Sequence, residues 1–277
     1  MLRRYILFLK KSPIITALLA IVYIMVCIKK VDTSTNFQVF LVRTMLCGAV
    51  CFFLYQISGD KTLTSIYNST GYVIKVSIGF LIIATLIGIV LMVMSLQGDA
   101  PISDNPVLGT LVLFLMFMAV GLFEELAFRA VINDAIIYKF RDWKYVFVLS
   151  AVVSSIAFGA AHVIGFNTSS YLAWLQAIGK TLSSGVFGLA LLILYWKTRN
   201  IWACGVVHGL YDFLASFSMG IYKSPALQHT SYVASDENAI QVIILYSVLT
   251  VIEGAFALII WKKIGKKIDF KKIRKDW

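Results

Sequence analysis

Long runs of apolar residues constrain this chain more than any other feature of its sequence. Each run is close to the ~20 residues that an α-helix needs to cross the hydrocarbon core of a bilayer. A helix satisfies its own backbone hydrogen bonds in lipid, so each run is predicted to be a membrane helix. Eight spans are predicted, at residues 13–28, 37–57, 73–96, 107–126, 145–164, 171–195, 201–219 and 240–261.

The composition agrees with lipid as the solvent of these helices. Apolar residues make up 60% of the chain and charged residues only 14%, against about 25% charged residues in ordinary soluble domains. The four cysteines lie within apolar runs and show no C-x-x-C spacing, which argues against a disulfide framework. The predicted fold class is therefore an all-α, polytopic membrane helix bundle.

The basic residues indicate both a partner and an orientation. The net charge is +11, and eight of the 25 Lys and Arg residues lie between Lys262 and Lys275. Such a juxtamembrane tail is expected to bind anionic lipid of the cytoplasmic leaflet rather than nucleic acid. The positive-inside rule predicts cytoplasmic N- and C-termini. The richness in Lys and Ile favours a bacterial plasma membrane.

Three segments are expected along the chain. Residues 1–105 form an N-terminal three-helix membrane segment, and residues 106–219 form a core that carries most of the intramembrane polar groups. Residues 220–277 hold an external loop, the last membrane helix and the basic cytoplasmic tail. The stretch 106–140 would be about 52 Å long as one helix, so it is predicted to bend or to continue along the interface after Glu124.

Two adjacent carboxylates interrupt the fourth apolar run, in the sequence GLFEELAFRA. A charged residue at the bilayer centre costs about 2.5–3.5 kcal/mol on insertion scales, so such residues usually face a polar cavity. Glu125 and Arg129 are spaced i and i+4 and can pair, whereas Glu124 points about 100° away and is the freer acid. Alternatively, both acids sit near an interface and simply pair with Arg129.

Two histidines lie in other apolar runs. His162 follows Phe158 by four residues, among small residues that allow helices to approach closely. Cys204, His208 and Asp212 recur every four residues and so share one helix face. A histidine with a carboxylate at i+4 suits metal ligation or orientation of the imidazole for proton transfer, while Cys204 is expected only to pack.

Convergence of Glu124, His162 and His208 around one buried water would provide a general base, a water-orienting imidazole and a third polar group. That set is typical of hydrolysis in a polar intramembrane cavity. The third histidine, His229, lies in the expected external loop, and neither it nor Lys180 nor Arg43 is assigned a role.

The motifs E-E-x-x-x-R at Glu124 to Arg129, F-x-x-x-H at Phe158 to His162 and H-x-x-x-D at His208 to Asp212 occur in this order. Together they resemble the CAAX-processing and bacteriocin-processing (CPBP, or Abi) family of intramembrane proteases. The resemblance covers residues 106–219. It implies an endopeptidase in which Glu124 activates water with help from His162.

The resemblance leaves the task of His208 and Asp212 open between metal ligation and stabilisation of an oxyanion. An ionised Asp212 would repel an oxyanion, which favours metal ligation, orientation of His208 or a protonated carboxyl. The cofactor is therefore either none or a divalent metal such as zinc. Supporting roles fall to Glu125, Arg129 and Phe158, and the possible metal ligands are Glu124, His162, His208 and Asp212.

Two other classes of protein remain open. One is a catalytically silent relative that acts as a membrane scaffold or a bacteriocin self-immunity protein. The other is a transporter or proton-coupled channel, because intramembrane Glu, His and Asp also form proton relays. For a protease, prenylated proteins, peptide pheromones and bacteriocin precursors are all possible substrates, and no oligomeric state follows from the sequence.

Overall fold

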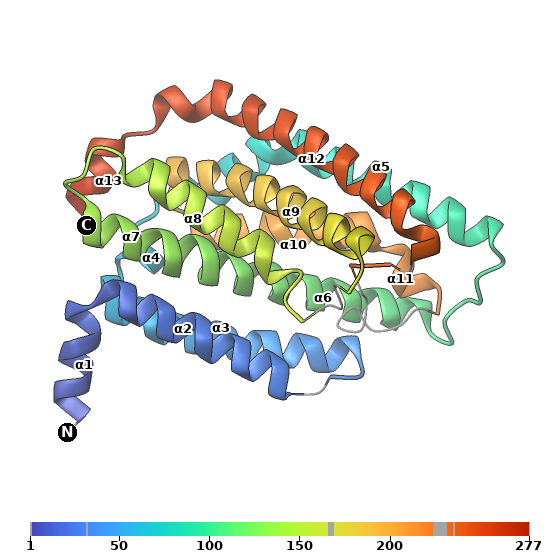
Figure 1. The fold of residues 1–277 in the computed structure, drawn as a ribbon, viewed down its shortest axis with the longest axis horizontal. Coiled ribbons are helices and arrows are strands. Elements are labelled where there is room, and N and C mark those ends of the chain that lie inside the picture. Colours follow the sequence, from blue (N-terminus) through green and yellow to red (C-terminus); the bar gives the residue numbers. More distant parts are fainter. Residues whose placement is uncertain (1, 32, 166–168, 224–231, 235, 277) are drawn as a thin grey trace. The chain divides into compact units, whose positions relative to one another are not determined.

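The computed structural model describes residues 2–31, 33–165, 169–223, 232–234 and 236–276 of the 277-residue chain. Within these residues the regular elements are helices (Figure 1), apart from a single β-bridge between Ile102 and Tyr222. The predicted all-helical fold class is confirmed, and a helix lies at each of the eight predicted span positions.

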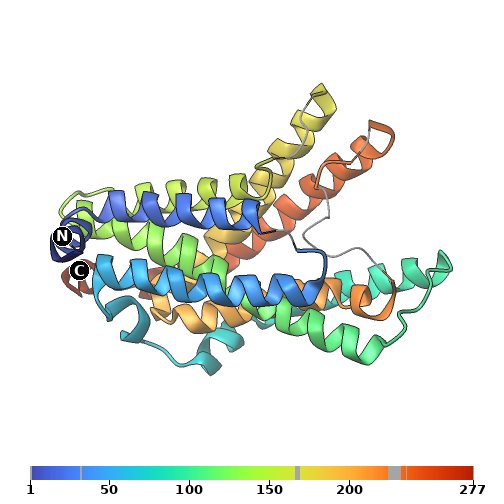
Figure 2. The same ribbon diagram turned by 90° about the horizontal axis from the view of Figure 1, so that it is seen from below.

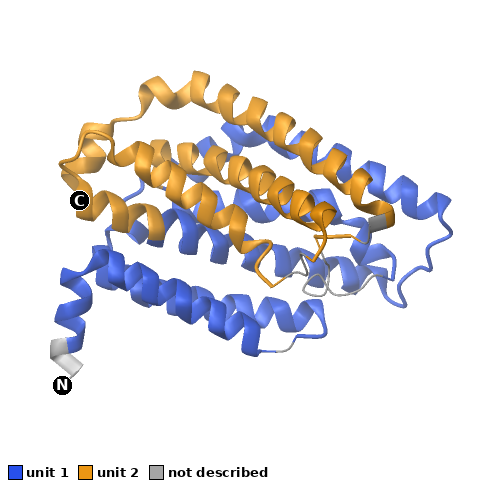
Figure 3. Cartoon of the chain, in the orientation of Figure 1, with its two compact units in different colours: residues 1–131, 200–230 blue, residues 132–199, 231–277 orange. Residues whose placement is uncertain are grey.

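The chain divides into two compact units (Figure 3). The boundaries of these units differ from those of the three predicted segments, which stay a prediction. Unit 1 comprises residues 1–131 and 200–230. Its helices are α1 (Leu2–Lys11), α2 (Pro13–Lys30), α3 (Asn36–Ser58), α4 (Lys61–Thr64), α5 (Thr70–Gln97), α6 (Pro106–Glu124), α10 (Ile201–Ser216) and α11 (Ser218–Ile221). Helix α6 packs against α3, α10 and α11, and α10 packs also against α5.

Unit 2 comprises residues 132–199 and 231–277. Its helices are α7 (Asn133–Phe140), α8 (Val146–Ala161), α9 (Tyr171–Thr198), α12 (Asp236–Ile264), a 3₁₀ turn (Gly265–Lys267) and α13 (Phe270–Asp276). Helix α9 packs against both α8 and α12, and the views in Figures 1 and 2 show α9 and α12 running side by side. The basic tail predicted from the sequence thus ends in a short helix.

Side-chain caps explain where several helices begin. Thr35 and Gln38 form a reciprocal capping box at the start of α3. Asn105 accepts a hydrogen bond from the backbone N–H of Leu108, and Pro106 follows it at the first position of α6. Thr and Asn are favoured at these places because they satisfy backbone N–H groups that lack a partner inside the helix.

Six helices in the described part of the chain are long and apolar enough to cross a bilayer. They are Pro13–Lys30, Asn36–Ser58, Thr70–Gln97, Pro106–Phe140, Tyr171–Thr198 and Glu237–Lys267. Helices α8 and α10 have 16 residues each, which gives about 24 Å at 1.5 Å per residue. Eight crossings therefore stay a prediction, because these two fall short of the ~30 Å hydrocarbon core.

The outer faces of these helices are apolar. On α5, Ile82 is 54% exposed and Leu86 is 57% exposed, and similar side chains recur along α2 and α12. Exposed apolar surface on this scale is not expected in water. Together with the six long apolar helices, it identifies the chain as a multi-pass helical membrane protein.

The long stretch 106–140 changes its helix type where a bend or an interfacial helix was predicted. Helix α6 ends at Glu124, a π-helix spans Glu125–Ile132, and α7 continues to Phe140. A π-helix inside an α-helix is rare and is often found at functional sites. The change of hydrogen-bonding pattern coincides with the two adjacent carboxylates.

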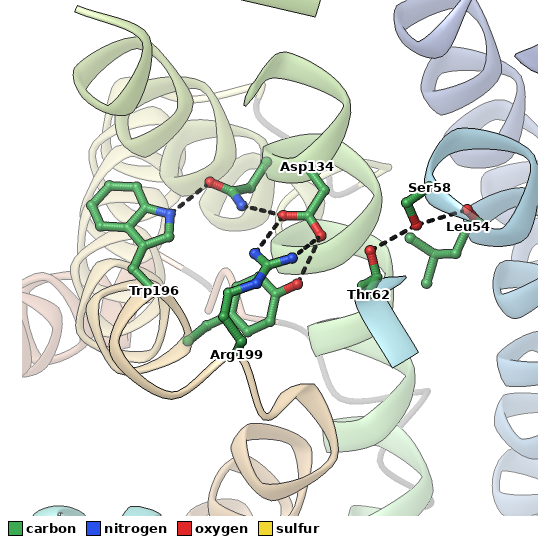
Figure 4. A network of polar contacts seen from close by, with 8 residues as sticks. Leu54, Ser58, Thr62, Asp134, Trp196 and Arg199 are labelled. Carbon is green, nitrogen blue, oxygen red and sulfur yellow. Dashed lines mark hydrogen bonds and ion pairs between the residues drawn. The ribbon is translucent and has the colours of Figure 1, made fainter. Parts of the chain in front are cut away.

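A buried polar network fastens α7 to the end of α9 (Figure 4). Arg199 donates to both carboxylate oxygens of Asp134, over 2.9 and 3.0 Å, and the Tyr195 hydroxyl donates to Asp134 Oδ2 over 2.7 Å. Asn133 bridges this cluster to Trp196: its Nδ2 donates to Asp134 Oδ1, and its Oδ1 accepts from Trp196 Nε1. The network holds in place the segment that directly follows the π-helix.

Candidate active site

The π-helix holds a buried ion pair between an acidic and a basic side chain, Glu125 and Arg129. Glu125 Oε2 lies 3.3 Å from Arg129 Nε, and both side chains are almost fully buried. This is the i, i+4 pair predicted from the sequence. Glu124 is partly exposed, at 16% of its side chain, whereas Glu125 is not exposed at all. Glu124 is thus the carboxylate with access to space outside the packed helices.

Helix α10 brings its histidine to these carboxylates. His208 Nδ1 lies 2.9 Å from Glu125 Oε1, a hydrogen-bonding distance. An ionised carboxylate can only accept, so Nδ1 carries the proton and Nε2 points the other way. His208 Nε2 lies 3.6 Å from Glu124 Oε2 and 3.4 Å from Asp212 Oδ2. One imidazole is therefore placed among three carboxylates.

Glycines make this approach possible. A Cβ atom on Gly121 of α6 would collide with the backbone of Gly209 and would lie 2.6 Å from the carbonyl oxygen of Gly205, both on α10. On Gly209, in turn, it would lie 2.6 Å from the carbonyl oxygen of Phe117. Small residues at a crossing let two membrane helices come into backbone contact. Glu124 and His208 lie one turn or less from this crossing.

The α10 stripe predicted from the sequence is present, with different environments along it. Cys204 and His208 are buried, whereas the Asp212 side chain is 27% exposed. Asp212 and Glu124 thus form the more accessible side of the cluster, and Glu125 with Arg129 forms its closed side. A polar group or water that reaches His208 Nε2 would do so between Glu124 and Asp212.

His162 follows the last residue of α8, in unit 2, and Nδ1 lies 2.8 Å from the carbonyl oxygen of Phe158. Because a carbonyl accepts, Nδ1 holds the proton and Nε2 is the basic nitrogen of the neutral ring. The ring centres of Phe158 and Tyr232 lie 4.8 and 6.0 Å from the centre of the His162 imidazole. Glu124 and His208 belong to unit 1, so convergence of all three on one water stays a prediction.

Lys180 and Arg43, which were assigned no role from the sequence, each lie beside an aromatic ring. Lys180 is half-buried with its Nζ 4.3 Å from the ring centre of Tyr232, and Arg43 lies 5.0 Å from that of Phe123. Both arrangements are cation–π contacts. His229 lies outside the described residues.

One intramembrane acid, Glu253 of α12, was missed by the sequence reasoning. It is only 5% exposed, and its Oε2 accepts a 2.8 Å hydrogen bond from the hydroxyl of Ser183 on α9. The signal was available, because Glu253 interrupts the apolar run TVIEGAFALII as Glu124 interrupts its own. Asp134 was missed for another reason: it follows Asn133 beyond the end of the predicted span 107–126, where an acid is ordinary.

A divalent metal at this site would need several ligating side chains around one point. Among the described residues, no three His, Cys, Asp or Glu side chains are arranged to hold an ion. His208 Nδ1 is taken by Glu125, and only its Nε2 faces Glu124 and Asp212. Metal ligation by Glu124, His208 or Asp212 stays a prediction, and the proposed reaction does not depend on it.

Comparison with known proteins gives one match. Residues 106–214 match the family model of the type II CAAX prenyl endopeptidase, Rce1-like. No curated protein and no solved structure matches the chain significantly. The matched residues include all three motifs and the buried cluster of Glu125, Arg129 and His208. Residues 106–214 of this membrane protein are thus similar to the Rce1-like type II CAAX prenyl endopeptidases, which belong to the CPBP family.

Proposed function

We propose that this protein is an intramembrane endopeptidase in which Glu124 activates water. The match of residues 106–214 to this family model implies an intramembrane protease. The observation that carries the proposal is the placement of His208 between the buried Glu125 and the more accessible Glu124 and Asp212. A carboxylate with access to water, beside an imidazole of fixed tautomer, is an arrangement suited to general acid–base catalysis.

The proposed reaction needs one carboxylate to take and return a proton. Glu124 accepts a proton from water as the oxygen attacks the scissile carbonyl carbon. The tetrahedral intermediate then expels the amine, to which Glu124 returns the proton, so that no proton is gained or lost overall. His162 is proposed to orient the water through its basic Nε2. This role requires α8 to bring His162 to the cluster.

Glu125 and Arg129, the closed side of the cluster, are proposed to act by positioning His208. Arg129 compensates the charge of Glu125, and Glu125 holds the Nδ1 proton of His208. His208 could stabilise an oxyanion only if Nε2 also carried a proton, since Nδ1 already donates to Glu125. Asp212 beside Nε2 would then orient the ring rather than contact the oxyanion, which its charge would repel.

The proposed substrate is a membrane-associated peptide that is prenylated or carries a leader. The proposed location is a bacterial plasma membrane with both termini in the cytoplasm, because the basic residues gather beside the ends of α2, α9 and α12 expected on that side. Reporter fusions at the C-terminus and in the loop at Asp99 test this orientation. A reporter that works only in the cytoplasm should be active when fused to the C-terminus. A reporter that works only outside the cytoplasm should be active when placed in the loop at Asp99.

The experiment is a peptide-cleavage assay on the full chain in proteoliposomes. The probes are fluorogenic CAAX peptides with and without a prenyl group, and a leader-bearing peptide. Glu124→Gln keeps the size of the side chain but cannot accept the proton, so kcat should fall by at least about 10²-fold. Glu237→Gln, an exposed acid outside the cluster, is the matched control and should keep its activity.

Unchanged cleavage by a folded Glu124→Gln variant would contradict the proposal. Folding is checked by gel filtration and by helix content. If none of the probes is cleaved while Glu124→Gln lowers abundance or assembly, a catalytically silent scaffold or self-immunity protein is the better description. Proton or solute flux in the same liposomes would instead indicate a transporter.

A further inference from the structure

Unit 2 contains an apolar groove that the proposed hydrolysis does not use. Its volume is about 750 Å³, and its walls come from α8, α9 and α12. The walls include Val152, Ile193 and Leu258. Val152 and Leu258 are 50% and 61% exposed, so the groove opens toward whatever surrounds the membrane helices.

The groove has a basic mouth. Lys144 and Arg274 line the groove at the end where α8 begins and where α13 follows α12. Arg274 is fixed there, because its guanidinium donates to the carbonyl oxygens of Arg141 and Lys144 over 2.8 and 3.1 Å and lies 5.4 Å from the ring centre of Phe147. A positive charge is thus held at one end of an apolar slot.

The length of the groove matches one leaflet. Along α9 its lining runs from Trp196 back to Val186, ten residues that rise about 15 Å. The hydrocarbon core of a bilayer is about 30 Å thick, so the lining covers about half of it. The lining parts of α8 and α12 lie in the same half, next to the basic residues predicted to be cytoplasmic.

A glycine opens one wall of the groove. Gly254 of α12 lines it, and a Cβ atom added there would meet only Val186 Cγ1, at 3.8 Å, which is an ordinary contact. This glycine is therefore not required by close helix packing. A larger side chain at this position has room to enter the groove, which provides a direct way to fill it.

We propose that the groove binds one anionic phospholipid of the cytoplasmic leaflet. An acyl chain lies between α8, α9 and α12, and the phosphate lies at Lys144 and Arg274. Basic pockets between membrane helices on the cytoplasmic side are suited to anionic head groups, and guanidinium and ammonium groups bind phosphate through charge-assisted hydrogen bonds. An uncharged prenyl chain would use the apolar wall but would leave the basic mouth without a function.

The test is native mass spectrometry of the full-length protein from nanodiscs that contain equal amounts of phosphatidylglycerol and phosphatidylcholine with the same acyl chains. The wild type should retain one phosphatidylglycerol in preference to phosphatidylcholine. Lys144→Glu reverses the charge at the mouth and should lower the retained phosphatidylglycerol about tenfold. Gly254→Leu fills the groove and should lower retention while the protein stays folded.

The matched control is Lys266→Glu, the same charge reversal at an exposed residue that lies in the same basic tail but does not line the groove. An equal loss with Lys266→Glu would show diffuse surface attraction and overturn the proposal. So would equal retention of the two lipids, or unchanged retention in folded Gly254→Leu. Displacement of the phosphatidylglycerol by a prenylated peptide would show that the groove is a substrate site instead.

Discussion

Removal of the Asp134 carboxylate tests how strongly the polar network of Figure 4 stabilises unit 2. Asp134 is fully buried and accepts two hydrogen bonds from Arg199, one from Tyr195 and one from Asn133. Asp134→Ala would take away the counter-charge of an arginine that is only 3% exposed. The main cost of this substitution is therefore the lost counter-charge rather than the small cavity that the shorter side chain leaves.

The magnitude follows from the burial of the pair. Breaking a buried ion pair by removing one partner costs about 3–5 kcal/mol, because it leaves a buried charge without its counter-charge. The Tyr195 hydroxyl also loses an acceptor, but these losses share one network and are not additive. We expect the free energy of unfolding to fall by about 4 kcal/mol, which is about a 10³-fold change in the unfolding equilibrium.

The assay is reversible unfolding of the purified protein in mixed micelles with increasing sodium dodecyl sulfate, followed by tryptophan fluorescence. The double variant Asp134→Leu with Arg199→Met is the control, because replacing both partners of a buried pair by apolar residues is often neutral. It should recover most of the lost stability. The reasoning is refuted if Asp134→Ala lies within 1 kcal/mol of the wild type, or if the double variant is no more stable than the single one.

Three further predictions concern the helix contacts. Glu125→Ala removes the acceptor that orients His208, so kcat for a cleaved probe peptide should fall at least about 10²-fold with KM little changed; a shift in KM alone would contradict a positioning role. Gly209→Ala places a methyl group against the α6 backbone and should destabilise the protein by about 1–3 kcal/mol in the same micelle assay. Ser183→Ala leaves the buried Glu253 with one donor fewer and should cost about 1–3 kcal/mol, whereas an unchanged unfolding curve would show that the bond contributes nothing.

The sequence by itself determined the class of fold and located the polar groups to which the proposed chemistry is assigned. Apolar runs near the length of a bilayer crossing located the eight helices, because period and length are local properties of the chain. The i, i+4 spacing likewise predicted the ion pair of Glu125 with Arg129, and His208 lies 3.4 Å from Asp212 as their shared helix face implies.

Only the tertiary structure decided what these groups face. The π-helix at Glu125–Ile132 was not predicted from the sequence, and the contact of His208 with Glu125 joins residues 83 positions apart. That contact requires α6 and α10 to meet at glycines, a match between two helices that neither helix reveals alone. The ion pair of Asp134 with Arg199 likewise joins residues that are far apart in the sequence. Each is an ordinary polar residue near a helix end, and only the fold brings the two together in a buried place.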